Sequence, residues 1–222
     1  ADSQTYADSL NLAALALPPK GLLVLLGESF SGPIAISLAA ANPKRVVGLF
    51  CAARLFVTQD QVCVGSVVWP VFQRPSRRRD SSVQCSSAGR DAEIAFMLQN
   101  ALAKVPPVVL RARLRAVVSV DVREQARTLG LPVLYLKATS DRLVPQLAVV
   151  EVAKYCRNMT VQSFDAPHCL LQAVPVEAAK AVADFVKKVS YRETEYGHCM
   201  IVLAFAVSFL LPRQATYLHD GH

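Results

Sequence analysis

Short hydrophobic runs alternate along the chain with segments of helical spacing. The run LLVLL after Gly21 is short and continuous, which is typical of a strand buried on both faces. Pro33 and the following IAISLAAAN predict a helix that ends at Asn42-Pro43, and RVVGLFCAA predicts the next strand. A strand, a helix and a strand in this order predict a parallel sheet with helices on its faces.

The same alternation returns in the second half of the chain. LPVLYLKA and MTVQSF predict two further strands, with QLAVVEVAKYC as a helix between them. Residues 175–189 carry the pattern of an amphipathic helix, and residues 5–17, 91–104 and 106–118 also predict helices. Asp121 is placed to cap another short helix. The predicted fold class is therefore α/β, with a mostly parallel sheet and helices on both faces.

Two segments do not follow this plan. Residues 73–90 are rich in Ser and Arg, which favours a loop or linker. Residues 199–211 form an apolar run, CMIVLAFAVSFLL, which is shorter than the roughly 17–25 residues of a membrane-spanning helix. We expect a buried or interfacial segment there, with membrane contact and self-association as open alternatives. The predicted organisation is one domain over 1–189, with a cap or insert at 58–118, and an atypical tail over 190–222.

Composition supports a single globular domain. The 222 residues are 53% hydrophobic and 18% charged, which is enough apolar material for one substantial core. The net charge of +7 is partly local, because Arg74 and Arg77 to Arg79 lie in one short run. No aromatic residues alternate with these arginines, so we expect a solvated loop and no nucleic-acid partner.

The cysteines predict neither a metal site nor a disulfide framework. Their spacings include no CxxC pair, and we expect free, mostly buried thiols in a reducing compartment. Residues 1–10 lack the basic and apolar regions of a signal peptide, which favours the cytoplasm. The six cysteines are Cys51, Cys63, Cys85, Cys156, Cys169 and Cys199.

The strongest chemical candidate is Ser29 in GESFSG. A serine hydroxyl becomes a nucleophile only when a base accepts its proton and an acid orients that base. Ser29 lies between a predicted strand and a predicted helix, which is the context of a nucleophile elbow. In the pattern G-x-S-x-G the second glycine is replaced here by Ser31, with Gly32 next. The alternative is a small-residue bend without chemistry.

His168 is the candidate base. It follows a predicted strand in DAPHCLLQ, whereas His198, His219 and His222 all lie in the atypical tail. Active-site residues of parallel sheets lie on loops at the carboxyl ends of strands. A lone histidine is more often structural than catalytic, so this position alone leaves both roles open.

Asp141 is the candidate acid. It follows the predicted strand PVLYLKA in ATSDRLVP, again at a strand's carboxyl end, although a turn-forming aspartate is the alternative. Asp121 more naturally caps a helix. Asp165 lies on the same loop as His168 and is less able to reach the far nitrogen of the imidazole.

The order Ser29, Asp141, His168 is the order associated with the α/β-hydrolase fold. The segments LLGESFSGPIAISLAAANP, PVLYLKATSDRLVP and FDAPHCLLQAVPVEAAKAVADFV resemble the nucleophile, acid and histidine segments of the α/β-hydrolase superfamily, in particular serine esterases and lipases. The resemblance covers roughly residues 5–57 and 105–189.

The resemblance implies a serine hydrolase that cleaves a small-molecule carboxylic ester through an acyl-enzyme. Ser29 would attack the carbonyl, His168 would transfer the proton, and Asp141 would orient the imidazole. The backbone N–H of Phe30 would supply one oxyanion donor. Residues 58–118 would form the variable cap over the pocket. No metal and no organic cofactor is expected.

The chain departs from the family before the elbow. Family members have several strands there, with a loop that gives the second oxyanion donor, whereas 28 residues precede Ser29 here. We therefore expect one open sheet edge, which favours self-association. The alternative function is a non-catalytic α/β-hydrolase scaffold that acts as a ligand-binding or membrane-associated interaction protein.

Overall fold

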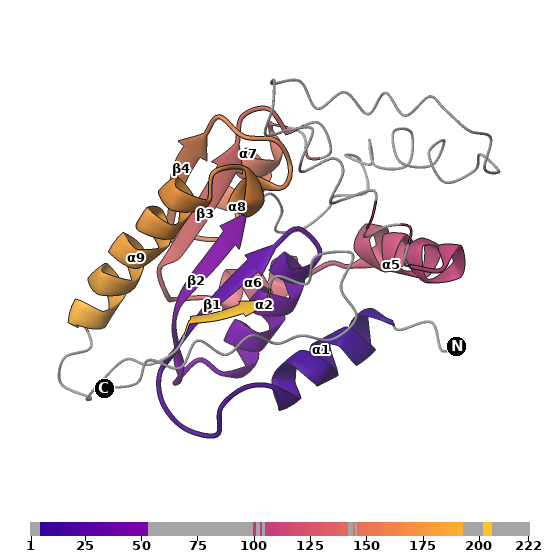
Figure 1. The fold of residues 1–222 in the computed structure, drawn as a ribbon. Helices are drawn as coiled ribbons and strands as arrows, with labels where there is room; N and C mark the ends of the chain where they lie inside the picture. Colours follow the sequence, from indigo (N-terminus) through magenta and orange to yellow (C-terminus); the bar gives the residue numbers. More distant parts are fainter. Residues whose placement is uncertain are drawn as a thin grey trace.

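The computed structural model describes residues 5–52, 100, 103, 105–141, 144, 146–192 and 202–205. Within these residues one parallel sheet runs in the order β4-β3-β2-β1-β5 (Figure 1). Its strands are β1 (Leu23–Glu28), β2 (Val46–Ala52), β3 (Val133–Ala138), β4 (Met159–Phe164) and β5 (Val202–Phe205).

Helices cover both faces of the sheet, as the sequence predicted (Figure 1). Helices α1, α2, α6 and α7 contribute to the core on one face, and α8 and α9 pack on the other. Their bounds are α1 (Tyr6–Leu15), α2 (Ser31–Ala41), α6 (Arg123–Thr128), α7 (Ala148–Ala153), α8 (Leu170–Ala173) and α9 (Pro175–Arg192). A further helix, α5 (Pro107–Ser119), precedes α6.

The continuous apolar run of β1 is explained by burial on both faces. Leu23 and Leu25 point into the core under α2, whereas Val24 and Leu26 point into the core under α9. All six residues of β1 are buried. Because successive side chains of a strand point to opposite faces, a central strand with two covered faces needs apolar residues at every position.

Helix α7 is shorter than its sequence pattern predicted. The segment QLAVVEVAKYC contributes only Ala148–Ala153 to the helix. The following residues continue with tighter backbone bonds, in which the N–H groups of Lys154 and Tyr155 donate to the carbonyls three residues earlier. Of the helix predicted over 91–104, only residues 100 and 103 are described and both are helical, while 73–90 lies outside the described residues.

The open sheet edge expected from the short segment before Ser29 does not lie at β1, because β5 pairs there and is itself an edge strand of the described sheet. Strand β5 pairs with β1 in parallel, with Val24 opposite Val202 and Gly27 opposite Phe205. The apolar tail run supplies this strand because its Val, Leu and Phe residues favour extended backbone and can satisfy the free N–H and C=O groups of β1. Among the described residues, no helix is both long enough and apolar enough to cross a membrane.

None of the three cysteines that the structure describes forms a disulfide. Cys51 and Cys156 are buried, and Cys169 is partly buried. Burial raises the pKa of the Cys51 thiol, and burial also raises the pKa of Cys156 to about 11. Both groups therefore remain protonated at neutral pH and act as core residues. The other three cysteines lie outside the described residues.

The role of β5 can be tested with two truncations, one ending at residue 201 and one ending at residue 205. The shorter chain leaves the edge of β1 unpaired, so we expect self-association and a lower thermal midpoint. The longer chain keeps β5 and should behave like the full chain. Sedimentation velocity and thermal unfolding measure both properties. Identical behaviour of the two truncated chains would show that β5 does not protect this edge.

Candidate active site

The site begins at a strained turn between β1 and α2. Ser29 has a φ of 52°, and no other non-glycine residue in the described ranges has a positive φ. The Ser29 N–H donates to the carbonyl of Ala52 at 3.0 Å, and the Gly32 N–H donates to the carbonyl of Ser29 at 3.1 Å. This unfavourable backbone conformation is fixed from both sides, which is typical of functional positions.

The small residues of GESFSG allow the close approach of β1 and α2. A Cβ at Gly27 would lie 2.7 Å from the Cα of Gly32 and from the carbonyl oxygen of Ser31. The Ser31 hydroxyl, fully buried, donates to the Glu28 carbonyl at 2.8 Å and accepts from the Glu28 N–H at 2.9 Å. Ser31 therefore closes the turn with two hydrogen bonds that a glycine at this position would lack.

Three side chains from three separate loops meet at this turn. Ser29 Oγ lies 2.8 Å from His168 Nε2, and His168 Nδ1 lies 2.8 Å from Asp141 Oδ2. Ser29 follows β1, Asp141 follows β3 and His168 follows β4, so all three lie at the carboxyl end of the sheet. The structure thus brings together all three side chains that the sequence nominated.

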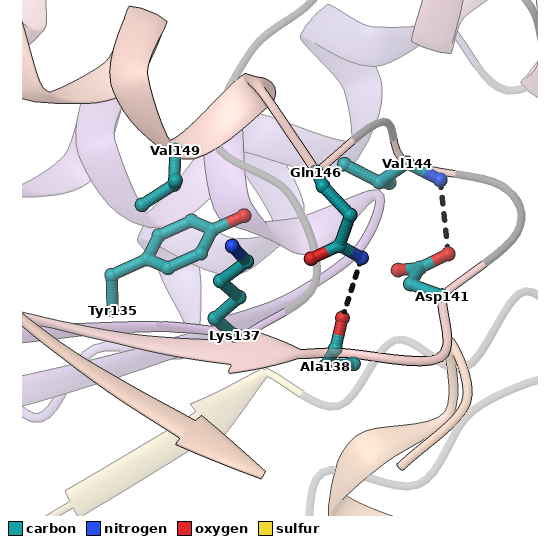
Figure 2. Close-up of a pocket in the computed structure, with 7 residues that line it drawn as sticks. All are labelled: Tyr135, Lys137, Ala138, Asp141, Val144, Gln146 and Val149. Carbon is teal, nitrogen blue, oxygen red and sulfur yellow. Dashed lines mark hydrogen bonds between the residues drawn. The ribbon is translucent and has the colours of Figure 1, made fainter. Parts of the chain in front are cut away.

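Asp141 is more deeply buried than the imidazole it contacts. Its side chain is only 3% exposed, against 19% for His168. The second carboxylate oxygen, Oδ1, accepts a hydrogen bond from the Val144 N–H at 2.9 Å (Figure 2). With one oxygen anchored to backbone, the other is oriented toward the ring, which favours the tautomer with hydrogen on Nδ1.

The competing aspartates have other partners. The Asp165 carboxylate accepts hydrogen bonds from the hydroxyl groups of Ser140 at 3.0 Å and Thr139 at 3.4 Å. Asp121 accepts from the backbone N–H of Arg123 at 3.0 Å and forms an exposed ion pair with its guanidinium. His198, His219 and His222 lie outside the described residues.

Sequence reasoning did not single out Glu28. This carboxylate is 8% exposed, and it accepts hydrogen bonds from the backbone N–H of Leu171 and the side-chain amide of Gln172. Burial raises the pKa of the Glu28 carboxyl, whereas these two bonds and the charge of His168 act in the opposite direction. The sequence feature that could have identified Glu28 is a charged residue at the end of an otherwise apolar strand.

The cavity beside Asp141 is too small for an ester. Its volume is about 10 Å³, on the scale of a single water molecule (Figure 2). The Gln146 amide donates to the carbonyl of Ala138 at 3.0 Å at its rim. The cavity is lined by Tyr135, Lys137, Ala138, Asp141, Val144, Gln146 and Val149.

A larger concavity of about 590 Å³ lies at the opposite end of the sheet. It is bordered by residues at the starts of strands, including Leu22, Val46 and Pro132, and is therefore remote from Ser29. The predicted cap over 58–118 falls largely outside the described residues. No group of three or more His, Cys, Asp or Glu residues suited to a metal ion occurs in the described part of the chain.

Comparison with solved structures decides the fold. BpoC of Mycobacterium tuberculosis H37Rv, described as a non-heme bromoperoxidase, matches with a TM-score of 0.65 and 20% identity, over 85% of this chain and 76% of that chain. A thermophilic esterase matches with a TM-score of 0.61 and 21% identity, over 85% and 75%. A carboxylesterase of Nitrososphaera gargenis matches with a TM-score of 0.68 and 16% identity, over 85% and 74%.

This chain has the α/β-hydrolase fold. The fold predicted from the sequence resemblance is therefore confirmed. No protein-family model matches the sequence, and no curated protein matches it either. Within the α/β-hydrolase fold of this chain, the turn at Ser29 joins β1 to α2 at the same end of the sheet as the loops that carry Asp141 and His168.

The close contact at Gly27 predicts that a larger residue at this position destabilises the fold. Gly27→Ala places a methyl group against backbone atoms of α2, so we expect the free energy of unfolding to fall by about 1–3 kcal/mol. Gly130→Ala is the matched control, because a Cβ at Gly130 meets no atom within 4 Å. Urea unfolding of both variants measures the difference. Equal stability of the two variants would contradict the packing described for the elbow.

Proposed function

We propose that this chain is a serine hydrolase that cleaves carboxylic esters through an acyl-enzyme. The observation that carries this proposal is the unbroken hydrogen-bond series from Ser29 Oγ through His168 to Asp141. The fold adds support, since solved structures similar to this chain include a thermophilic esterase and a carboxylesterase. The bond-making and proton-transfer steps of this reaction use these side chains, the substrate and water.

In the first half-reaction Ser29 Oγ attacks the carbonyl carbon of the ester. His168 Nε2 accepts the hydroxyl proton as the new C–O bond forms, and Asp141 stabilises the resulting imidazolium. The tetrahedral intermediate then collapses, the bond to the alcohol oxygen breaks, and His168 returns the proton to the departing alcohol. Water repeats the sequence on the acyl-enzyme and releases the carboxylic acid.

The negative charge that develops on the carbonyl oxygen requires hydrogen-bond donors. We assign the backbone N–H of Phe30 as one donor, because this residue directly follows Ser29 and stands at the start of α2. A single oxyanion donor is typically worth about 100- to 1000-fold in rate. The second donor is not assigned to any residue that the structure describes.

A fluorophosphonate probe tests the proposal, because it reacts with serines that have an activated hydroxyl. We expect stoichiometric labelling at Ser29, detected by mass spectrometry, and no labelling in Ser29→Ala. His168→Ala removes the base and Asp141→Asn disrupts its orientation, so both should slow labelling by roughly 1000-fold or more. Asp121→Asn is the control and should label at the rate of the unmodified chain.

The same experiment separates the proposal from its alternative. Folded protein that remains unlabelled at high probe concentration would exclude a competent serine hydrolase and favour a non-catalytic scaffold. Far-UV circular dichroism and a cooperative thermal transition establish that each variant is folded. Labelling that persists in Ser29→Ala would place the reactive serine elsewhere.

A further inference from the structure

Strand β4 is an edge strand whose outer side has no partner strand among the described residues. Within those residues it pairs with β3 alone, and it lies at the end of the sheet opposite β5 (Figure 1). Its four central residues, 160–163, are all exposed. Because successive side chains of a strand point to opposite faces, neither face of β4 is fully covered at its middle. This exposure leaves room for a second strand beside β4.

The odd-numbered residues of β4 direct their backbone groups to the open side. The Val133 N–H donates to the carbonyl of Asn158, and the Thr139 N–H donates to the carbonyl of Phe164, so the even-numbered positions face β3. Alternate residues of a strand direct their N–H and C=O groups to opposite sides. In the part of the chain that the structure describes, no hydrogen bond reaches the backbone groups on the open side. These groups belong to Met159, Val161 and Ser163.

The sequence of β4 lacks the features by which edge strands usually prevent pairing. Such strands carry charged residues, often Lys, or contain a proline or a bulge. MTVQSF contains no charged residue and no proline, and its register with β3 is unbroken over the six residues. This edge is therefore suited to pairing with another strand.

We propose that β4 pairs in antiparallel orientation with β4 of a second copy of this chain, around a two-fold axis at Val161. Val161 then lies opposite Val161 of the second copy, and Met159 lies opposite Ser163. Each opposed pair exchanges two backbone hydrogen bonds, so every outward N–H and C=O group of both strands has a partner. The assembly closes after two copies, because each β4 has only one open side.

Charge complementarity favours a second copy as the partner and favours this register. Arg157 and Asp165 lie at equal distances along the chain from Val161, so the two-fold axis places each opposite the other on the second copy. Both residues are exposed, and neither takes part in an ion pair within the described ranges. Moving the axis by one residue would place Arg157 opposite Ser163 or Pro167, and both ion pairs would be lost.

The two-fold axis gives a specific test, because Val161 opposes itself. Val161→Lys would bring two positive charges together at the centre of the interface, and Val161→Glu would bring two negative charges together. We expect the dimer dissociation constant of each variant to rise by about tenfold or more. An equimolar mixture of the two variants should form a heterodimer whose dissociation constant is within about threefold of the value for the unmodified chain.

Sedimentation equilibrium of the full chain, the two variants and their mixture measures these constants. Val108→Lys and Val108→Glu are the matched controls and should dimerise like the unmodified chain. Val108 is 52% exposed, against 43% for Val161, and it lies on α5, far from β4 (Figure 1). A monomeric full chain, assemblies larger than a dimer, or a dimer that the Val161 variants leave intact would overturn the proposal. Weakened variants that do not recover on mixing would overturn it as well.

Hydrogen exchange tests the same interface without any substitution. The N–H groups of Met159, Val161 and Ser163 gain acceptors only in the dimer, whereas those of Thr160 and Gln162 already face β3. Raising the protein concentration through the dissociation constant should slow exchange at the three outward amides by about tenfold or more. The two inward amides should be protected at every concentration. Outward amides whose exchange does not depend on concentration would overturn the pairing.

The dimer and the proposed hydrolase activity can fail separately. The dimer is measured by sedimentation and hydrogen exchange, and neither readout depends on a reactive serine. A chain that dimerises through β4 without being labelled by the fluorophosphonate probe would overturn the proposed function alone. A labelled chain that stays monomeric would overturn the dimer alone.

Discussion

The positive φ of Ser29 is the constraint on which the rest of the site depends. A strand that turns directly into a helix must bring the two backbones close together. Here that closeness requires Gly27, where any Cβ would meet α2, and it is held by the Ser31 hydroxyl, which pairs with both backbone groups of Glu28. The strained conformation is thus stabilised by surrounding hydrogen bonds and packing rather than by Ser29 itself.

The parallel arrangement of the strands brings two further residues to this turn. Because β1, β3 and β4 all run in the same direction, the loops after them emerge at one edge of the sheet, and residues far apart in sequence meet there. The burial of Asp141 and the anchoring of its Oδ1 by Val144 leave one oxygen to hold the imidazole. The fold therefore brings the three residues together, and local hydrogen bonds orient their side chains.

The sequence was sufficient for features that depend on local pattern. The continuous apolar runs predicted β1 and its neighbours because strands covered on both faces need such runs, and the loops after them nominated Ser29, Asp141 and His168. Features that depend on distant partners were missed. The bond from Leu171 to Glu28 and the pairing of β5 with β1 join residues whose association no local pattern encodes. Helix α7 was overestimated because its apolar spacing continues to Cys156, whereas the N–H groups of Lys154 and Tyr155 donate to the carbonyls three residues earlier.

The position of β5 has a consequence for the order of folding. The strand that presents the proposed nucleophile receives its last neighbour from near the other end of the chain, so a growing polypeptide leaves the ribosome with one side of β1 unpaired until residues 202–205 emerge. Contacts of such long sequence separation form slowly, because the chain loses loop entropy before the pairing stabilises it. Until β5 is made, β1 is therefore open to incorrect pairing.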